Sequence, residues 1–286
     1  MRHHLPIKAL ASVLLVLGLC GCTATLFRYV NRGLPPADLT DAFAPELGLS
    51  MDVYKPRAVA TAHPTPVVVF LYGGSWQRGA RAQYTFVGRR LADNGVLAVV
   101  ADYRTYPRAR FPAFMDDAAR AVRRVHDAAA GWGGDPDRIF VAGHSAGAQI
   151  AALLATDPRY LGAHGMEPRQ LSGVIGLSGP YDFDVTGRLV AIFGPPSQWP
   201  RAQAVNFVDG DEPPFLLLHG TGDKVVAYSE SVELATRLEA KGVSATLALM
   251  PDAGHIAPLA ALYDPERAPE VLADILAFVN RPRDAH

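Results

Sequence analysis

The sequence is poor in cysteine. Its 286 residues include only two, Cys20 and Cys22, and both lie within the first 22 positions. The rest of the chain therefore cannot form an internal disulfide bond, supply a thiolate nucleophile or bind a metal ion through cysteine.

The sequence also lacks an excess of charge of one sign. Its formal net charge is −1, and no long block of like charge occurs. Nucleic-acid binding depends on a basic surface, so we expect no nucleic-acid partner. A chain of this length with 49% hydrophobic residues suffices instead for one α/β domain with a large core.

The apolar run near the N-terminus, Ala9 to Leu19, is too short to span a bilayer. Preceded by Arg2 and Lys8, it has the length of the hydrophobic part of a secretory signal. The dipeptide Gly21-Cys22 that follows resembles a bacterial lipobox, in which a small residue precedes an acylated cysteine. Residues 1–22 are therefore predicted to be a lipoprotein-type signal peptide and lipobox, with Cys22 as the lipidation site.

This N-terminus predicts a location. A lipidated Cys22 would attach the protein to a membrane through an N-terminal lipid anchor and leave the rest soluble in character. We expect the protein in the bacterial cell envelope, lipid-anchored and facing the periplasm or exterior, or secreted if the signal is simply cleaved. Residues 23–41, which include Pro35 and Pro36, are interpreted as a tether.

From residue 42 onward, short β-type runs alternate with helix-type runs. This pattern predicts an α/β fold with a mostly parallel central sheet and helices on both faces, as one domain over residues 42–283. The expected strands are Leu47–Tyr54, Val67–Tyr72, Val96–Ala101, Ile139–Ala142, Gly173–Leu177, Phe215–Leu218 and Ala245–Met250. The expected helices include Tyr84–Asn94, Pro112–Trp132, Ser229–Lys241 and Ala268–Asn280. Residues 178–214 have no regular periodicity, and we interpret them as a small cap or flap.

Ser145 sits where a predicted strand changes directly into a predicted helix. The stretch Gly143-His144-Ser145-Ala146-Gly147 has the G-x-S-x-G pattern of a nucleophile elbow. A serine on so tight a turn has a strained backbone, and side chains two residues before and after it would collide with the strand and helix. The dipole of the following helix also favours negative charge beside the serine. We therefore expect Ser145 to be a nucleophile.

A serine nucleophile needs a base that is oriented by an acid, and in this fold order the acid and then the histidine follow the serine. Asp223 follows the predicted strand Phe215–Leu218, and His255 follows the strand that ends at Met250. Both lie in glycine-containing loops at the carboxyl ends of strands, where open α/β sheets bind ligands. The predicted catalytic triad is Ser145, Asp223 and His255.

Other side chains compete for these roles. His219 stands at a strand end, where a buried, hydrogen-bonded histidine is expected, and His144 is predicted to pack beside the nucleophile. Three further acids are interpreted as solvated loop carboxylates: Asp209, Asp211 and Asp252.

The oxyanion of an acyl-transfer intermediate needs backbone N–H donors. One should come from Ala146, directly after the nucleophile, and others from the glycine-containing loop after the Val67–Tyr72 strand, namely Gly73, Gly74 and Ser75. The candidate walls of the substrate site are aromatic residues, Trp76, Phe183, Phe193 and Trp199. No metal-ligand cluster or dinucleotide fingerprint accompanies these residues, so no cofactor is expected.

Six motifs carry a family resemblance, namely Tyr72-Gly73-Gly74-Ser75-Trp76, Asp102-Tyr103-Arg104, Gly133-Gly134-Asp135-Pro136, the Ser145 elbow, His219-Gly220-x-x-Asp223 and Gly254-His255. With them the chain resembles an α/β-hydrolase of the carboxylesterase type, near the hormone-sensitive-lipase-like and BD-FAE-like (bifunctional feruloyl and acetyl xylan esterase) groups. The resemblance covers roughly Leu47 to Asn280 and implies the α/β-hydrolase fold. One position departs from it, because these families usually have histidine where this chain has Tyr72. Backbone donors should survive that change, whereas the packing of the loop should differ.

The resemblance implies a serine carboxylic-ester hydrolase that works through an acyl-enzyme on a small-molecule ester. The short cap favours small acyl groups. The same motifs occur in kynurenine formamidase-like (arylformamidase) and isoprenylcysteine methylesterase-like enzymes, which remain alternatives. The non-enzymatic alternative is an inactive hydrolase-fold lipoprotein that binds a ligand, although such proteins typically lose the nucleophile or the histidine.

Overall fold

The computed structural model describes residues 25–57 and 65–281. The predicted signal peptide and lipobox, with Cys22, lie outside the described residues. Among the helices in these two ranges, none combines the length and apolar character that a membrane span requires.

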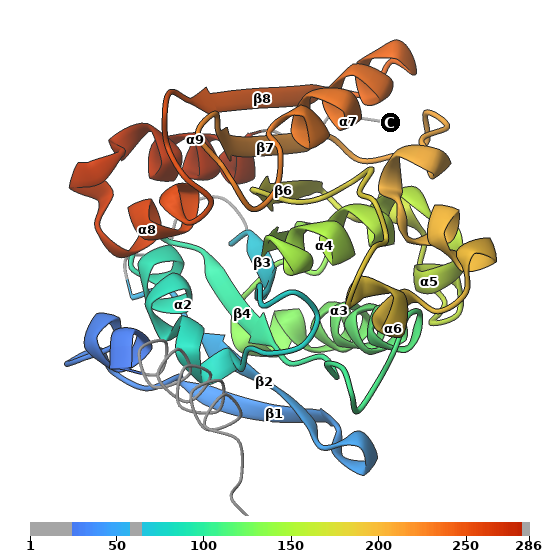
Figure 1. The fold of residues 1–286 in the computed structure, drawn as a ribbon. Coiled ribbons are helices and arrows are strands. Elements are labelled where there is room, and N and C mark those ends of the chain that lie inside the picture. The colour runs from blue at the N-terminus through green and yellow to red at the C-terminus, as the bar shows by residue number, and fades with distance from the viewer. Residues whose placement is uncertain (1–24, 58–64, 282–286) are drawn as a thin grey trace, which may run out of the picture.

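A mostly parallel sheet forms the centre of the described chain (Figure 1). Its strands are β1 (Leu39–Ala44), β2 (Leu49–Tyr54), β3 (Val67–Leu71), β4 (Leu97–Ala101), β5 (Ile139–His144), β6 (Gly173–Leu177), β7 (Phe215–Gly220) and β8 (Ala245–Met250). They lie in the order β1-β2-β4-β3-β5-β6-β7-β8. β2 is antiparallel to both β1 and β4, and all other neighbours are parallel.

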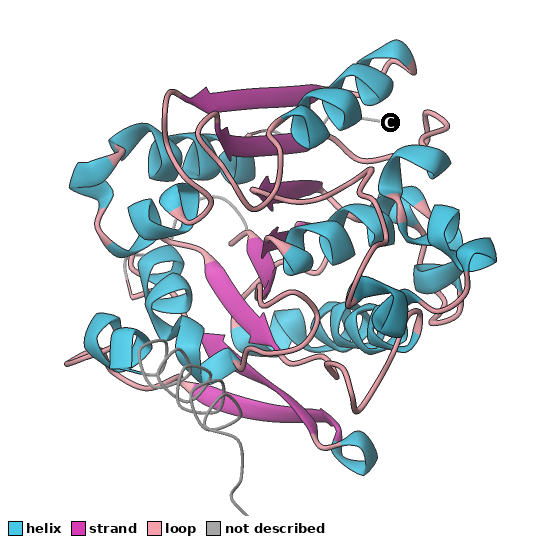
Figure 2. Ribbon diagram, in the orientation of Figure 1, coloured by secondary structure: helices cyan, strands magenta, loops and turns pink. Residues whose placement is uncertain are grey.

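Helices cover both faces of this sheet (Figure 2). In one group of helices, α8 (Ala257–Tyr263) packs against both α2 (Thr85–Ala92) and α9 (Pro269–Asn280). A second group consists of α3 (Ala113–Trp132), α4 (Ala146–Thr156) and α5 (Pro158–Gly162), and α7 (Ser229–Ala240) packs on β7 and β8. The predicted α/β architecture, with a mostly parallel sheet between helices, is confirmed.

The register of the sheet brings distant loops to one edge. Every residue of β3 to β7 is buried, as expected for strands covered on both faces. Leu71 at the end of β3 lies opposite Gly143, and Gly220 at the end of β7 lies opposite Met250. The loops that follow β3, β5, β7 and β8 therefore leave the sheet side by side.

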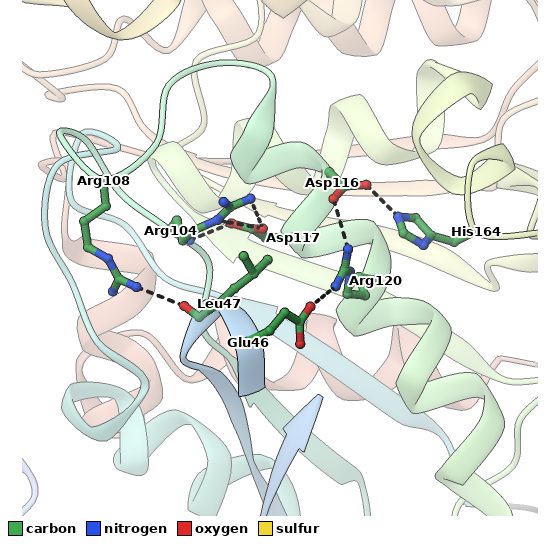
Figure 3. Close-up of polar contacts among 8 residues, drawn as sticks. All are labelled: Glu46, Leu47, Arg104, Arg108, Asp116, Asp117, Arg120 and His164. Carbon is green, nitrogen blue, oxygen red and sulfur yellow. Dashed lines mark hydrogen bonds and ion pairs between the residues drawn. The ribbon is translucent and has the colours of Figure 1, made fainter. Parts of the chain in front are cut away.

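The loop after β4 is fastened to α3 (Figure 3). The Arg104 guanidinium donates to the fully buried carboxylate of Asp117, with 2.6 Å between Nη2 and Oδ1. The backbone N–H of Arg104 donates to the same carboxylate at 2.9 Å. Further along α3, Arg120 pairs with Glu46 at 2.5 Å and joins the helix to the N-terminal hairpin. Through Arg104, the Asp102-Tyr103-Arg104 motif thus holds the loop after β4 against α3.

Residues 25–41 do not form the tether that the sequence suggested. Residues 25–30 are helical. The Asn31 side chain that follows donates to the carbonyl oxygens of Ala82 and Gln83, at 3.3 and 2.9 Å, and accepts from the Phe86 amide at 3.0 Å. This helix is therefore held against the domain.

The prolines that suggested a linker lie in a segment that the domain also holds. The side chain of Arg89 is only 3% exposed, and it pairs with Asp38 at 2.8 Å. It also donates to the carbonyl oxygens of Pro35 and Pro36. The next residues form the edge strand β1, so the folded domain begins well before residue 42.

The expected cap, residues 178–214, consists of short helical pieces between β6 and β7. They are α6 (Leu189–Phe193), η4 (Pro196–Ala202) and η5 (Ala204–Phe207). Phe193 is fully buried and packs against Phe111 and Phe114, with ring centroids 5.6 and 6.1 Å apart. This aromatic contact anchors the cap to the start of α3.

Candidate active site

Ser145 occupies the sharp turn between β5 and α4 with a backbone conformation of φ 54° and ψ −121°. A Cβ atom on Gly143 would lie 2.3 Å from the backbone of Gly147, and one on Gly147 would lie 2.0 Å from the Leu71 carbonyl oxygen. Backbone atoms cannot move far enough to relieve contacts this short, so the turn requires glycine at both positions. The Ser145 amide donates to the Leu177 carbonyl oxygen at 2.9 Å and fixes the turn on the sheet.

The structure brings the three predicted triad residues together. His255 Nε2 lies 2.9 Å from Ser145 Oγ, and His255 Nδ1 lies 2.7 Å from Asp223 Oδ2. Neutral His255 with its proton on Nδ1 therefore donates to Asp223 and accepts from the serine hydroxyl. This is the arrangement in which a histidine can take the serine proton.

Asp223 is buried and is held as an anion. Its Oδ1 accepts from the amides of Val225 and Val226, at 2.7 and 3.0 Å. Burial alone would raise the pKa of Asp223, but the Val226 amide, His255 and the Val225 amide together lower it below its ordinary value. The acid can thus stabilise an imidazolium at His255.

His219 is the buried, hydrogen-bonded histidine that its strand-end position suggested. It is 0% exposed, its Nε2 donates to Asp223 Oδ2 at 3.1 Å and to the Val226 carbonyl oxygen at 3.2 Å, and its Nδ1 accepts from the Ser231 hydroxyl at 2.7 Å. Burial lowers the pKa of His219. A neutral His219 therefore supports the carboxylate without contacting the nucleophile.

His144 lies between the loop of Gly73 and the loop of His255. Its Nε2 donates to the His255 carbonyl oxygen at 3.1 Å, and its Nδ1 faces Gly73, where an added Cβ would lie 2.8 Å away. Burial, followed by the proximity of His255, lowers the pKa of His144 to about 4. The imidazole is therefore neutral at physiological pH and adds no second cation beside the base.

The loop after β3 has an unusual backbone conformation. Gly74, Ser75 and Trp76 all have positive φ angles, of 139°, 54° and 56°. Within the described ranges, the amides of Gly74, Ser75 and Ala146 have no hydrogen-bond acceptor. Because Gly73 packs against Ser145 and its neighbour His144, these free donors border the nucleophile.

Tyr72, the departure from the family pattern, is an aromatic support for this loop. Its ring stacks between those of Tyr84 and Tyr103, with centroids 5.7 and 4.6 Å away. The Tyr103 hydroxyl donates to the Tyr72 carbonyl oxygen at 2.6 Å, and the Tyr72 hydroxyl contacts Asp102 Oδ1 at 3.3 Å. Gly79 packs directly against the Tyr72 ring, and this contact leaves no room for a Cβ atom at position 79. Tyrosine therefore fills the position by stacking.

Ser145 lies at the junction of two pockets that share Ser75, Ser145 and Val225. The first, of about 250 Å³, is named here the Phe27 pocket, and its further lining includes Phe27, Gly74, Arg78, Tyr84, His144 and His255. The second, of about 490 Å³, is named here the cap pocket, and its further lining includes Trp76, Phe183, Arg188, Leu189, Val226 and Glu230. Ser145 is therefore accessible from both pockets.

The four predicted wall residues separate into two kinds. Trp76 and Phe183 line the cap pocket and stack on each other at 5.3 Å. Phe193 lies behind them, fully buried, and Trp199 donates its indole N–H to the Gly194 carbonyl oxygen within the cap. Phe27 and Val225 were missed by sequence reasoning, because pattern alone does not place an isolated side chain near a loop from another part of the chain.

The other predicted acids lie apart from the triad. Asp209 and Asp211 line a hollow beside Glu212, and Asp252 is an exposed turn residue with a φ of 54°. In the described residues, no three histidine, cysteine or acidic side chains are grouped to hold a metal ion. His164, for example, is engaged with Asp116 at 2.8 Å (Figure 3).

The sheet, the elbow and the three converging loops define an α/β-hydrolase fold. The family profile of BD-FAE matches residues 51–238, and the chain belongs to the BD-FAE family.

Similar proteins include esterases from a bacterium and from a plant. Esterase LipC of Mycobacterium tuberculosis is 32% identical over 255 residues, which cover 80% of this chain and 60% of that protein. A probable isoprenylcysteine alpha-carbonyl methylesterase of Oryza sativa is 28% identical over 258 residues, with the same two coverages. The chain thus spans about three fifths of the length of these relatives.

Solved structures share the fold over most of the chain. The propionate-bound esterase Est2 of Thermogutta terrifontis superimposes with a TM-score of 0.72 at 25% identity, covering 87% of this chain and 98% of that one. A carbohydrate esterase from gut microbiota, at 23% identity, has a TM-score of 0.69 and shows the common fold.

Proposed function

We propose that the protein is a serine carboxylic-ester hydrolase that works through an acyl-enzyme. The observation that carries the proposal is the continuous hydrogen-bonded chain from Ser145 through His255 to Asp223, with distances of 2.9 and 2.7 Å. Membership of the BD-FAE family and the esterase relatives support the same class of reaction.

The reaction follows from this geometry. Ser145 Oγ attacks the ester carbonyl carbon while its proton passes to His255 Nε2, and the carbonyl electron pair moves to the oxygen. Collapse of the tetrahedral intermediate expels the alcohol, which takes the proton from His255 and leaves the acyl group on Ser145. Water then attacks with His255 as the base, releases the acid and restores the serine.

Three groups of this chain stabilise the charges that develop. The amides of Ala146 and Gly74, together with Ser75, are the proposed oxyanion donors, and the loss of one such donor typically costs about 3 kcal/mol of transition-state stabilisation. Asp223 holds His255 in one tautomer and stabilises the imidazolium. Neutral His144 avoids repulsion with that imidazolium, since two adjacent cations would oppose each other.

Esters with a short acyl group are the proposed substrates. The cap is made of short helical pieces, and the aromatic rings of Trp76 and Phe183 line the pocket beneath it. The Est2 structure of Thermogutta terrifontis with bound propionate supports a small acyl group in a related site.

A second candidate is a methylesterase acting on prenylcysteine methyl esters. It is favoured by the plant relatives named as isoprenylcysteine alpha-carbonyl methylesterases, which match 80% of this chain at 28% identity. Arylformamide hydrolysis would use the same triad, since all acyl transfers share the nucleophile and oxyanion requirements.

The test is hydrolysis of p-nitrophenyl acetate by the wild type, by Ser145→Ala and by Ser244→Ala, which alters an exposed serine. We expect Ser145→Ala to lose at least about 10³-fold in kcat while Ser244→Ala keeps wild-type activity. Equal rates for the wild type and Ser145→Ala would reject the serine mechanism. Parallel assays of butyrate, acetyl xylan, feruloyl, prenylcysteine methyl and N-formylkynurenine substrates then separate the candidates.

We also propose that Cys22 is acylated and anchors the domain in the bacterial cell envelope. The support is the sequence itself, in which Gly21-Cys22 follows an apolar run that is preceded by basic residues. A Cys22→Ala variant should leave the membrane fraction, and its continued sedimentation with membranes would contradict the lipid anchor.

A further inference from the structure

One wall of the Phe27 pocket comes from a part of the chain outside the region that defines the family. The BD-FAE match begins at residue 51, whereas Phe27 lies in the helical residues 25–30. Its side chain nevertheless lines the same pocket as Ser145 and His255. One wall of this pocket is thus a residue that lies outside the family match.

The helix is oriented to present this side chain. Phe27 and Val30 are partly buried against the core, while Leu26 and Tyr29 are 53% and 65% exposed. Residues three apart lie on one helix face, so the inward face is defined by Phe27 and Val30. The bonds from Asn31 to the backbone of residues 82, 83 and 86 then fix the end of the helix.

Aromatic contacts couple Phe27 to the loop beside the nucleophile. The Phe27 ring lies 5.2 Å from Tyr84, and Tyr84 stacks on Tyr72 at 5.7 Å with an interplanar angle of 18°. Burial raises the pKa of Tyr84 to about 12, so the phenol stays neutral. Phe27 therefore packs against a tyrosine ring that is itself held in place by stacking.

The position of His255 decides which half of an ester enters this pocket. The alcohol oxygen must receive its proton from His255 Nε2 when the tetrahedral intermediate collapses, and so it must lie within hydrogen-bonding reach of that atom. His255 belongs to the lining of the Phe27 pocket, whereas the lining of the cap pocket includes Trp76, Phe183 and Leu189. The alcohol half accordingly leaves through the Phe27 pocket while the acyl half occupies the cap pocket.

We infer that Phe27 determines the alcohol specificity of the enzyme by limiting the size of the leaving group. This inference rests on the proposed ester hydrolysis and deepens it. A ring in the wall of a pocket of about 250 Å³ limits the room for a long or bulky alcohol, and it does not belong to the lining of the cap pocket that would hold the acyl group. Replacing the ring by a methyl group therefore enlarges the pocket at this wall.

The experiment compares two series of esters on purified wild type and Phe27→Ala. In the first series the acyl group is always acetyl and the alcohol grows from ethyl to butyl, hexyl and benzyl; in the second the alcohol is always ethyl and the acyl group grows from acetyl to hexanoyl. We expect Phe27→Ala to raise the kcat/KM ratio of hexyl to ethyl acetate about tenfold, the scale of a few apolar contacts in a pocket. The ratio of ethyl hexanoate to ethyl acetate should not change.

Matched variants separate this effect from general loosening of the helix. Leu26→Ala removes an exposed neighbour on the same helix and should keep both wild-type profiles. Phe27→Trp should shift the alcohol preference in the opposite direction, toward ethyl acetate, and remains informative if Phe27→Ala folds poorly.

Unchanged alcohol profiles in both Phe27 variants, or a shift confined to the acyl series, would overturn the assignment. A folded wild type that hydrolyses none of these esters would instead overturn the proposed function, and the inference with it.

Discussion

The Nε2 atom of His144 lies 3.1 Å from the carbonyl oxygen of His255, so the residue before Ser145 holds the backbone of the proposed catalytic base. Because a carbonyl only accepts, the His144 proton must be on Nε2, and the Nδ1 lone pair faces Gly73. One neutral imidazole thus links the elbow, the histidine loop and the oxyanion loop.

This link predicts a pH dependence of stability. The pKa of His144 falls from 6.5 to about 4 on folding, so between these values the unfolded chain binds more protons than the folded one. The free energy of unfolding should therefore decrease as the pH falls from 6.5 to 4, with a contribution from His144 on the order of 3 kcal/mol. Urea denaturation of wild type and His144→Gln at several pH values gives the free energy of unfolding of each protein. Plotted against pH, the two sets of values should converge toward pH 4. Parallel curves would show that His144 does not titrate in this way.

The two loop aspartates that follow β7 and β8 should respond differently to amidation. Asp223→Asn should lower kcat by about 10⁴-fold, because an amide can stabilise the wrong tautomer of His255. Asp252→Asn is the matched control, since Asp252 is exposed and asparagine tolerates its positive φ. We expect its kcat to stay within about twofold of wild type. Steady-state kinetics on p-nitrophenyl acetate provide the measurement, and a similar loss in both variants would contradict the triad assignment.

Two Gly→Ala changes should have opposite effects on folding. Gly147→Ala would place a Cβ 2.0 Å from the Leu71 carbonyl oxygen, and we expect it to prevent correct folding of the elbow. Gly131, inside α3, has no atom within 4 Å of an added Cβ. Its replacement by alanine should stabilise the protein by about 0.5–1 kcal/mol through helix propensity. Soluble yield and thermal denaturation distinguish the two, and a stable, active Gly147→Ala enzyme would disprove the steric requirement.

Tyr72 should contribute through its ring more than through its hydroxyl. The hydroxyl contacts are long, at 3.3 Å, so Tyr72→Phe should cost about 1 kcal/mol or less. Tyr72→Ala opens a cavity between two stacked rings and should cost about 3–5 kcal/mol, with a lower kcat from a loosened oxyanion loop. Guanidinium denaturation measures both effects. Equal losses for the two variants would mean that the hydrogen bonds dominate.

Sequence patterns predicted the central fold because buried parallel strands leave continuous apolar runs. The expected strands Gly173–Leu177 and Ala245–Met250 have the observed bounds of β6 and β8. Ser145, Asp223 and His255 could be selected because each follows a predicted strand of the parallel sheet, and carboxyl ends of parallel strands share one edge. The glycines of the elbow were also predicted, although only the clash at Gly143, with Gly147, is local, and the clash at Gly147 is with the Leu71 carbonyl oxygen of β3.

The N-terminal segment and the pocket walls were not predictable in the same way. β1 has only one buried residue, and it is preceded by two prolines, so its composition resembles that of a linker. Phe193 and Phe183 are both aromatic residues of the cap, but only the tertiary fold places one in the core and the other beside Ser145. Long-range side-chain contacts of this kind leave no periodic trace in the sequence.

The nearly buried guanidinium of Arg89 has a consequence for where the chain can be shortened. Its acceptors, Asp38 and the carbonyl oxygens of Pro35 and Pro36, all precede residue 51, at which the family match begins. A protein cut back to the shared region would keep the cation and lose every one of these partners, and breaking a buried pair in this way typically costs about 3–5 kcal/mol. The part of the chain that stabilises the folded domain is therefore longer than the part that the family profile matches.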